Sequence, residues 1–238
     1  MSKLAIVTIH NGTQEELKKT LSSIDNQVKN PDLSIVVSKK KINNFYFRKK
    51  YRKFIIGKDS SLYNAMNLGI QESKNYHITF LNSGDYFYSK YSVGTIKKYI
   101  GNYPSICLNF ITILKNKKKY YKIKSLFFNK KNFLSHPSFV TPGSRKKIFF
   151  KENFKVISDG IWMRKCVSIF GVKKINKVTT THVLGGISSN PSFISITDSI
   201  KLSLYMGIKE LIKYFLIFLI RNKNIYYMLI YLRKYTKL

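Results

Sequence analysis

Acidic residues are scarce in this chain, which has 11 Asp and Glu against 43 Lys and Arg and a formal net charge of +32. Cysteine is scarce too: Cys107 and Cys166 lie in apolar segments without C-x-x-C spacing. This pattern indicates neither a disulfide framework nor a zinc site and fits a reducing cytosol. Long apolar runs are also lacking. Leu4 to Ile9 is shorter than the core of a signal peptide, and Tyr214 to Ile220 is too short and too closely flanked by charges to span a membrane.

The hydrophobic content and the length of the chain favour a folded domain. Hydrophobic residues make up 44% of the 238 residues and aromatic residues 15%, which is ample for a core and argues against global disorder. One α/β domain with an appendage is the expectation at this length. The basic excess has three interpretations: a nucleic-acid binder, a protein on an anionic membrane leaflet, or compositional drift in a chain rich in Lys, Asn, Ile, Tyr and Phe.

The first 37 residues predict a β-α-β unit. Leu4 to Ile9 is strand-like and ends at a turn, and Thr13 is an N-cap candidate for the helix that follows. Apolar residues recur in that helix at helical spacing: Leu17, Leu21, Ile24 and Val28. Pro31 ends it, and Leu33 to Val37 predicts a second, parallel strand reached by a right-handed crossover.

Further elements are predicted along the rest of the chain. They are a strand near Phe54 to Ile56, a helix capped by Ser60 or Ser61, a strand from Ile78 to Leu81, a helix near Val93 to Ile100, a strand from Ile106 to Leu114, a basic hairpin or loop from Lys115 to Lys131, a strand from His136 to Val140, a helix from Asp159 to Phe170 closed by Gly171, and strands from Val172 to Val178 and Thr181 to Leu184.

Residues 200–238 differ in character from residues 1–199, which we expect to form the main domain. The last 39 residues are basic, aromatic and aliphatic, and predict two helices broken near Asn222. An amphipathic pair in the membrane interface is one interpretation. The other is a helical tail that packs on the domain or on a second subunit.

The most informative stretch runs from Asp59 to Asp85. A polar turn opens an amphipathic helix, a short apolar strand follows, and that strand ends in Asn82-Ser83-Gly84-Asp85. Ligands of open α/β sheets gather at the carboxyl ends of strands. A small-residue turn with one carboxylate there is suited to hold a divalent metal and a diphosphate.

This stretch resembles family 2 glycosyltransferases of the GT-A fold, in the branch that builds bacterial O-antigen, capsule and related surface polysaccharides. The matching segments, in family order, are Thr8-Ile9-His10-Asn11 with Thr20 to Ile24, Asp59 to Ile70, Phe80 to Asp85, His136-Pro137-Ser138-Phe139, Ser158-Asp159 with Trp162 to Arg164, and Gly185 to Ser189. Together they cover roughly Leu4 to Asn190. The resemblance implies a Rossmann-like, mostly parallel central sheet flanked by helices, with a C-terminal helical tail.

The resemblance also implies an inverting, metal-dependent sugar transfer from a nucleotide-sugar. Asp85 would coordinate Mg²⁺ or Mn²⁺ at the diphosphate. Asp159 would be the general base for the acceptor hydroxyl, although an Asp at a helix N-terminus is also favoured by the helix dipole alone. The other expected site residues are His10, Asn11, Asp59, Asn64, Asn82 and Ser83 for the donor, and His136 for the diphosphate or the acceptor.

One departure concerns the nucleotide base. The family carries an Asp just after its second strand to recognise the base, and Ser38 stands there in this chain. The departure leaves the nucleotide open, with a uridine diphosphate sugar as first expectation. It also leaves open a catalytically weak relative that acts as a partner protein.

The expected acceptor is a polyprenyl-diphosphate-linked saccharide at an anionic membrane surface. The implied location is cytoplasmic, peripheral to the inner face of the bacterial cytoplasmic membrane. A nucleic-acid-binding module is the alternative that the charge suggests, but the chain has no helix-turn-helix, RNP, KH or zinc pattern, so no nucleic acid is expected.

Overall fold

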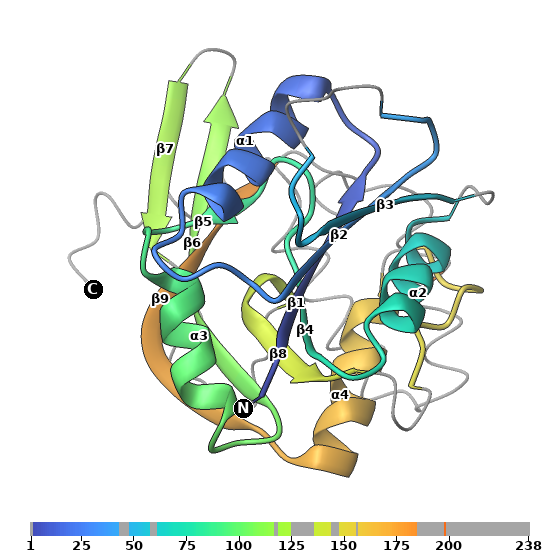
Figure 1. The fold of residues 1–238 in the computed structure, drawn as a ribbon, viewed down its shortest axis with the longest axis vertical. Coiled ribbons are helices and arrows are strands. Elements are labelled where there is room, and N and C mark those ends of the chain that lie inside the picture. Colours follow the sequence, from blue (N-terminus) through green and yellow to red (C-terminus); the bar gives the residue numbers. More distant parts are fainter. Residues whose placement is uncertain are drawn as a thin grey trace.

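The computed structural model describes residues 2–42, 48–57, 61–116, 119–124, 136–143, 148–155, 157–184 and 198. These residues form an α/β fold built on one nine-stranded mixed sheet. Its order is β3-β2-β1-β4-β8-β6-β9-β5, and β7 pairs with β6 outside this path. Figure 1 shows the sheet running through the molecule with α1 and α3 near the viewer.

The first half of the chain makes the parallel part of the sheet. Its elements are β1 (Leu4–His10), α1 (Gln14–Asp25), β2 (Leu33–Ser38), β3 (Arg52–Ile56), α2 (Leu62–Glu72) and β4 (His77–Phe80). β1 lies between β2 and β4 and is parallel to both, and β3 extends the parallel set beyond β2. All four carboxyl ends therefore meet at one edge, which we call the carboxyl edge.

The second half adds strands of both directions. Its elements are β5 (Tyr86–Phe87), α3 (Ser92–Ile100), β6 (Ile106–Asn116), β7 (Lys119–Lys124), η2 (His136–Ser138), β8 (Phe139–Pro142), α4 (Ser158–Phe170) and β9 (Lys173–Leu184). β8 runs antiparallel to β4 and β6, whereas β9 runs parallel to β6 and antiparallel to β5. Through this pairing the short β5 holds the turn that follows β4 next to β9.

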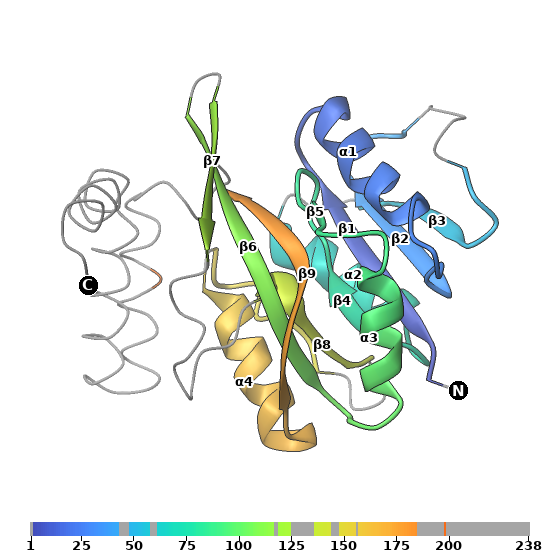
Figure 2. The same cartoon turned by 90° about the vertical axis from the view of Figure 1, so that its left-hand side faces the viewer.

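Two hydrophobic cores lie on the two faces of the sheet, as the alternation of side chains along β1 requires. Ala5, Val7 and Ile9 pack with α2 and α4 on one face, and Leu4 and Ile6 pack with α1 and α3 on the other. Figure 2 shows α4 on one side of the sheet and α1 with α3 on the opposite side. Such a three-layer arrangement leaves the carboxyl edge of the parallel strands between the layers.

Capping explains where three helices begin or end. Thr13 forms a complete capping box with Glu16, and the Ser61 hydroxyl accepts a hydrogen bond from the Asn64 N–H. At the other end of α4, Gly171 has a φ of 70°, which favours glycine. The sequence predicted the first and third of these boundaries from the same residues, and for the second it left the choice between Ser60 and Ser61 open.

Three predictions need correction. Val28 lies beyond the end of α1 and is 62% exposed, because Gln27 and Val28 turn toward the β5–α3 connection. His136 to Ser138 is a 3-10 turn rather than part of a strand, since proline cannot donate to a sheet ladder. The two strands predicted after Gly171 are one continuous strand, β9.

Other predictions lie outside the described residues or concern membranes. The helical tail of residues 200–238, and with it the boundary near 199, falls outside the described part, and so does the turn from Gly185 to Ser189. Among the helices that the structure describes, none is long and apolar enough to cross a bilayer.

Candidate active site at the carboxyl edge

The carboxyl edge gathers three of the segments that the sequence singled out. His10 at the end of β1 pairs in register with Ser38 at the end of β2. The turn Asn82 to Asp85 follows β4 directly, and its Ser83 N–H donates to the Ile9 carbonyl at 3.1 Å. The His10 Nδ1 and the Ser83 Oγ lie 3.1 Å apart, so the first loop and this turn form one surface.

The turn itself is held from α1. The Asp85 N–H donates to the Asn82 carbonyl at 2.9 Å, and Gly84 has a φ of 101°, which favours glycine. The buried Thr20 hydroxyl donates to the Asp85 carbonyl at 2.7 Å and accepts from the Gly84 N–H at 2.9 Å. One side chain of α1 therefore fixes both sides of the turn that presents Asp85.

Asp85 is buried, with 5% of the residue exposed, and its carboxylate points toward β9. Its Oδ1 accepts from the Val183 N–H at 2.8 Å, and the His182 Nδ1 lies 3.0 and 3.1 Å from its two oxygens. His182 is 97 residues from Asp85 in the sequence. The pairing of β5 with β9 brings them together, because Tyr86 lies opposite Thr181.

His136 lies next to this pair. Its ring stacks on Phe80 with the ring centroids 5.3 Å apart, and its Nε2 is buried with no hydrogen-bond partner among the described residues. Burial lowers the pKa of His136, while the carboxylates of Asp159 and Asp85 act in the opposite sense. The two carboxylates therefore both lie close enough to His136 to influence its charge.

Asp159 occupies the first turn of α4, where a carboxylate is favoured by the helix dipole. No side chain of the N-cap residue caps α4. The phenol of Tyr63, from α2, lies by the backbone N–H groups of Ser158 and Asp159, which lower its pKa. Burial outweighs them and raises the pKa of Tyr63 well above its usual value, so the phenol is neutral beside the first turn of α4.

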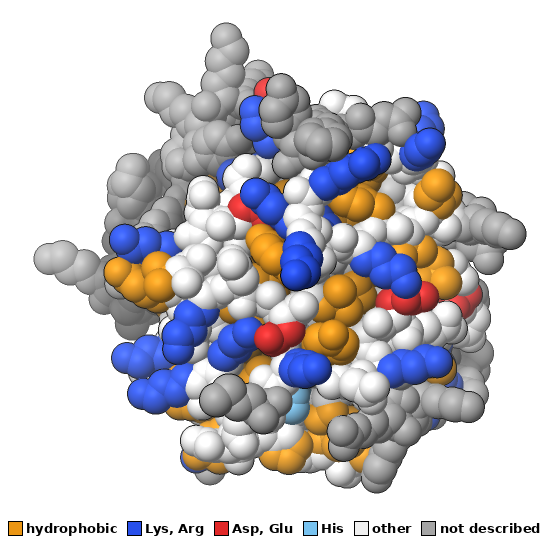
Figure 3. Space-filling model, viewed as in Figure 1, with side chains coloured by type: hydrophobic (Ala, Val, Ile, Leu, Met, Phe, Trp, Pro, Cys, Tyr) orange, Lys and Arg blue, Asp and Glu red, His pale blue; other side chains and the backbone are white. Residues whose placement is uncertain are grey.

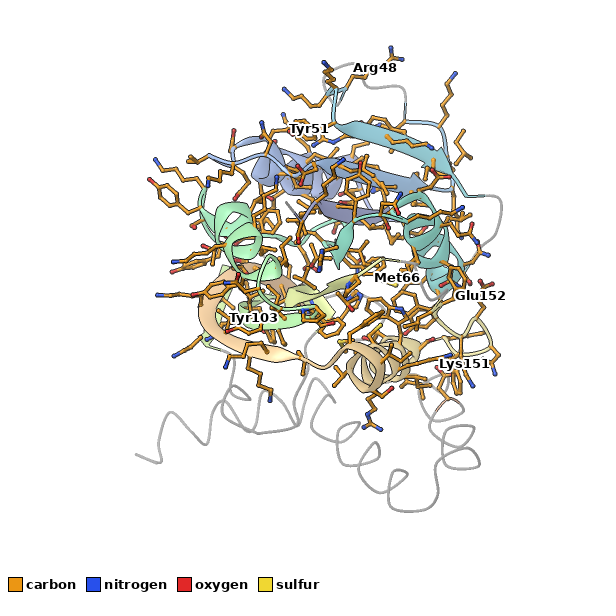
Figure 4. The ribbon with its side chains drawn as sticks, turned by 60° about the horizontal axis from the view of Figure 1, so that its bottom comes forward. Arg48, Tyr51, Met66, Tyr103, Lys151 and Glu152 are labelled. Carbon is orange, nitrogen blue, oxygen red and sulfur yellow. The ribbon has the colours of Figure 1, made fainter. Side chains whose placement is uncertain are left out.

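A polar clamp joins α2 to the segment before α4. The Asn67 side chain donates to the Phe150 carbonyl at 3.1 Å, accepts from the Phe150 N–H at 2.8 Å, and also donates to Glu152. Asn64 donates to the same Glu152 carboxylate at 3.2 Å. Figure 4 shows Glu152 beside α2. The clamp places Phe150 against Tyr63 and Trp162, which form the wall behind His136.

The structure thus brings together most of the predicted site residues. His10, Asn82, Ser83 and Asp85 share the carboxyl edge, and His136 links that edge to Asp159. These contacts leave the predicted roles as predictions. The structure adds little for two residues that were expected to bind the donor nucleotide-sugar. Asn11 is exposed, and Asp59 lies outside the described residues.

The roles of several residues of this site could not be read from the sequence. His182 lies within a β-branched run in β9, and nothing in the sequence relates it to Asp85. Thr20 and Tyr63 belong to segments that resemble the family, but their contacts with other elements, like those of Glu152, have no signal in the sequence. Asp198 is also buried, with its carboxylate accepting from the Lys155 N–H at 2.7 Å near the start of α4.

The donors near Asp85 could hold a divalent cation. Within the described residues no three His, Cys, Asp or Glu side chains come together. Asp85 and His182 provide two such groups, and Asn82 in the same turn adds an amide oxygen that is buried and has no hydrogen-bond partner in the described part. Carboxylate and amide oxygens with one imidazole fit Mn²⁺ at least as well as Mg²⁺, which prefers oxygen alone.

The strand order, the layers and the edge site define an α/β fold of the GT-A type. No protein-family model matches the chain, and no curated protein matches it in sequence. Solved structures do match. S. aureus TarS 1–349 in complex with UDP-GlcNAc aligns with a TM-score of 0.63 at 15% identity, over 84% of this chain and 66% of that chain. The same fragment without a named ligand aligns with a TM-score of 0.63 at 14% identity, over 92% and 72%.

A longer TarS structure shows how much of that protein this chain covers. Against the S. aureus TarS structure that is not confined to residues 1–349, the TM-score is 0.61 at 14% identity, and this chain covers 40% of that chain. The TM-scores establish a shared fold. Because the sequence identities are low, the activity has to be argued from the site.

Proposed function

We propose that this chain is an inverting, metal-dependent glycosyltransferase that moves a sugar from a nucleotide-sugar to a hydroxyl group of a lipid-linked oligosaccharide. The observation that carries the proposal is the arrangement around His136. Asp85 lies 3.0 Å from His182 at the carboxyl edge of a GT-A-like sheet, and the carboxylates of Asp85 and Asp159, from distant parts of the chain, both raise the pKa of the buried His136 beside them. Sugar transfer requires a diphosphate site and a general base near each other.

In the proposed reaction Asp159 accepts the proton of the acceptor hydroxyl. The acceptor oxygen forms a bond to the anomeric carbon, the bond from that carbon to the diphosphate oxygen breaks, and the nucleoside diphosphate leaves with the bonding electrons. Attack opposite the leaving group inverts the anomeric centre. The divalent cation, held by Asp85 with His182 and Asn82, would supply compensation for the charge of the diphosphate.

The residues of the first loop suit the nucleotide end of the donor. His10 and Ser83 form one polar surface at the ends of β1 and β4, and burial lowers the pKa of His10, so its imidazole is neutral at pH 7. Ser38 is buried at the end of β2 and its Oγ accepts from the Lys40 N–H at 3.3 Å. It offers a hydroxyl where the family has a carboxylate. TarS was solved with UDP-GlcNAc, which supports a UDP-sugar as the first donor to test.

The acceptor and the location are proposed from charge and composition. A net charge of +32 favours contact with an anionic leaflet, where a polyprenyl-diphosphate-linked saccharide would be anchored. We place the protein at the cytoplasmic face of the bacterial membrane, with the segment 200–238 in the interface. Removal of the residues after Ser199 should weaken binding to liposomes and leave nucleotide binding intact.

Turnover of the donor tests the proposal. We expect the wild-type chain to release nucleoside diphosphate from a UDP-sugar when Mn²⁺ is present. Asp159→Asn should retain donor binding and lose release by about 10²-fold or more, as expected when a general base is removed. Asp85→Asn should lose metal-dependent binding. Glu72→Gln, which removes an exposed carboxylate paired with Lys53, is the control and should match the wild type.

A second candidate is a catalytically silent relative that supports another transferase, and the absence of an acid at Ser38 favours it. This candidate predicts no release from any nucleotide-sugar by the wild-type chain. Release that depends on Asp159 would exclude it.

A further inference from the structure

Exposed apolar side chains gather at one place on the face that carries α1 and α3. The described residues include five exposed large hydrophobic side chains, and three of them are Val28, Tyr88 and Tyr91, with 62%, 48% and 58% of their surface exposed. Val28 follows α1, and the two tyrosines lie in the β5–α3 connection. Together with Lys29 and Lys90 we call them the Tyr-Lys patch. The other two, Ile56 and Ile169, lie in β3 and α4.

The patch is built by hydrogen bonds between its two segments. The Val28 N–H donates to the Lys90 carbonyl at 2.9 Å. The Gln27 side chain, which is buried, donates to the Ser89 carbonyl at 2.9 Å and accepts from the Val93 N–H at 2.9 Å. The exposed side chains are therefore presented by a fixed backbone.

The surroundings of the patch are basic. The Lys90 ammonium lies 5.3 Å from the centre of the Tyr91 ring, and the side chain of Lys29 runs along Gly94 of α3. The acids at the end of α1 and after it are already paired: Asp25 with Arg52 at 2.6 Å, and Asp32 with Lys97 at 2.9 Å. Figure 3 shows Lys and Arg side chains over this face with few Asp and Glu among them.

We propose that the Tyr-Lys patch is a docking surface for an anionic bilayer, separate from the C-terminal segment. Tyrosine and lysine are the side chains that favour the headgroup region, because each has an apolar body and a polar end. The aliphatic Val28 adds apolar area that can enter the acyl boundary but cannot stack on a nucleic-acid base. A second copy of the chain is disfavoured, since two molecules of charge +32 repel each other.

The proposal rests on the membrane-bound acceptor of the proposed function, but its test uses lipid vesicles without acceptor. A patch on the α1 and α3 face would give the described domain a contact of its own with the leaflet. Contact through this face would set the orientation of the carboxyl edge relative to the membrane.

A tryptophan reporter tests the patch directly. The chain has one tryptophan, Trp162, which is 2% exposed in the core. In full-length Tyr91→Trp, we expect vesicles of phosphatidylglycerol and phosphatidylcholine to shift the new emission to shorter wavelength. Lipids brominated near the headgroup should quench that emission. Ile169→Trp is the control, because Ile169 is exposed on α4, on the opposite face of the sheet; its emission should be unchanged.

Quenching of the new tryptophan decides whether the patch contacts lipid. Vesicle binding without quenching of the Tyr91→Trp emission would overturn the proposal, since the chain would then be anchored elsewhere. Quenching by single-stranded RNA but not by brominated vesicles would overturn it in favour of nucleic acid. Lys90→Gln should lower the partition coefficient about fivefold, the contribution of one lysine near an anionic leaflet. UDP-GlcNAc binding by the same variants reports separately on the proposed function.

Discussion

Thr20→Val should destabilise the protein and weaken donor binding at the same time. Valine has nearly the same shape as threonine, but it removes the hydroxyl that donates to the Asp85 carbonyl at 2.7 Å and accepts from the Gly84 N–H at 2.9 Å. The Asp85 carbonyl loses this donor, and the Gly84 N–H keeps only a longer bond of 3.3 Å to the Glu16 carbonyl. Loss of the donor to the Asp85 carbonyl and of the shorter bond to the Gly84 N–H costs about 2–3 kcal/mol in total.

The chain provides a matched control for this substitution. Thr8 is also 0% exposed, and its Oγ1 has no hydrogen-bond partner among the described residues. Thr8→Val therefore removes a buried hydroxyl without breaking a bond. The change should be neutral or stabilising by up to about 1 kcal/mol.

Urea and thermal unfolding compare the stability of the two variants with that of the wild type. We expect Thr20→Val to lower the melting temperature by about 5–10 °C, from roughly 2–4 °C per kcal/mol at this chain length. It should also raise the dissociation constant for a UDP-sugar with Mn²⁺, because the Asn82 to Asp85 turn loses its support. Thr8→Val should not lower the melting temperature. Equal stability of the two variants would refute the assignment of Thr20 as the support of the turn.

Two further predictions concern the wall behind the site. Tyr63→Phe removes the phenol beside the first turn of α4. It should lower kcat more than it raises KM and alter the pH dependence of kcat, because Asp159 loses a neighbour that positions it. A loss of stability without this split would mean that the phenol is only structural. Burial lowers the pKa of His136 below its ordinary value of 6.5, so the unfolded chain binds the proton more readily. The free energy of unfolding should therefore be fully retained above pH 6.5 and fall as the pH drops toward the folded pKa. His136→Phe, which keeps a ring on Phe80, should reduce this dependence in unfolding measured between pH 7 and 5.

The parallel half of the fold could be predicted from sequence because local signals agree there. β1, α1 and β2 are marked by apolar periodicity, by the Thr13 cap and by the break at Pro31. Periodicity failed where tertiary contacts decide. Val28 continues the helical spacing of α1, yet the bond from its N–H to the Lys90 carbonyl draws it away from the helix.

Only part of the candidate site could be expected from the sequence. Asn82 to Asp85 stood out because it follows a short apolar strand, and Asp159 because its segment resembles the family. His182 could not be found, because its relation to Asp85 depends on the pairing of a two-residue strand with β9. The contact of Tyr63 was equally hidden, although its segment resembles the family, since its phenol lies beside a helix that begins 95 residues later in the chain.

The measurement that tests the central claim most directly is the melting temperature of the purified chain with nucleoside diphosphates and nucleotide-sugars, each with and without Mn²⁺. A ligand present at about 100 times its dissociation constant should add roughly 2.7 kcal/mol to the free energy of unfolding. The account predicts a shift with a UDP-sugar that requires Mn²⁺ and disappears in Asp85→Asn. The absence of a shift with every nucleotide, or a shift that survives in Asp85→Asn, would contradict it.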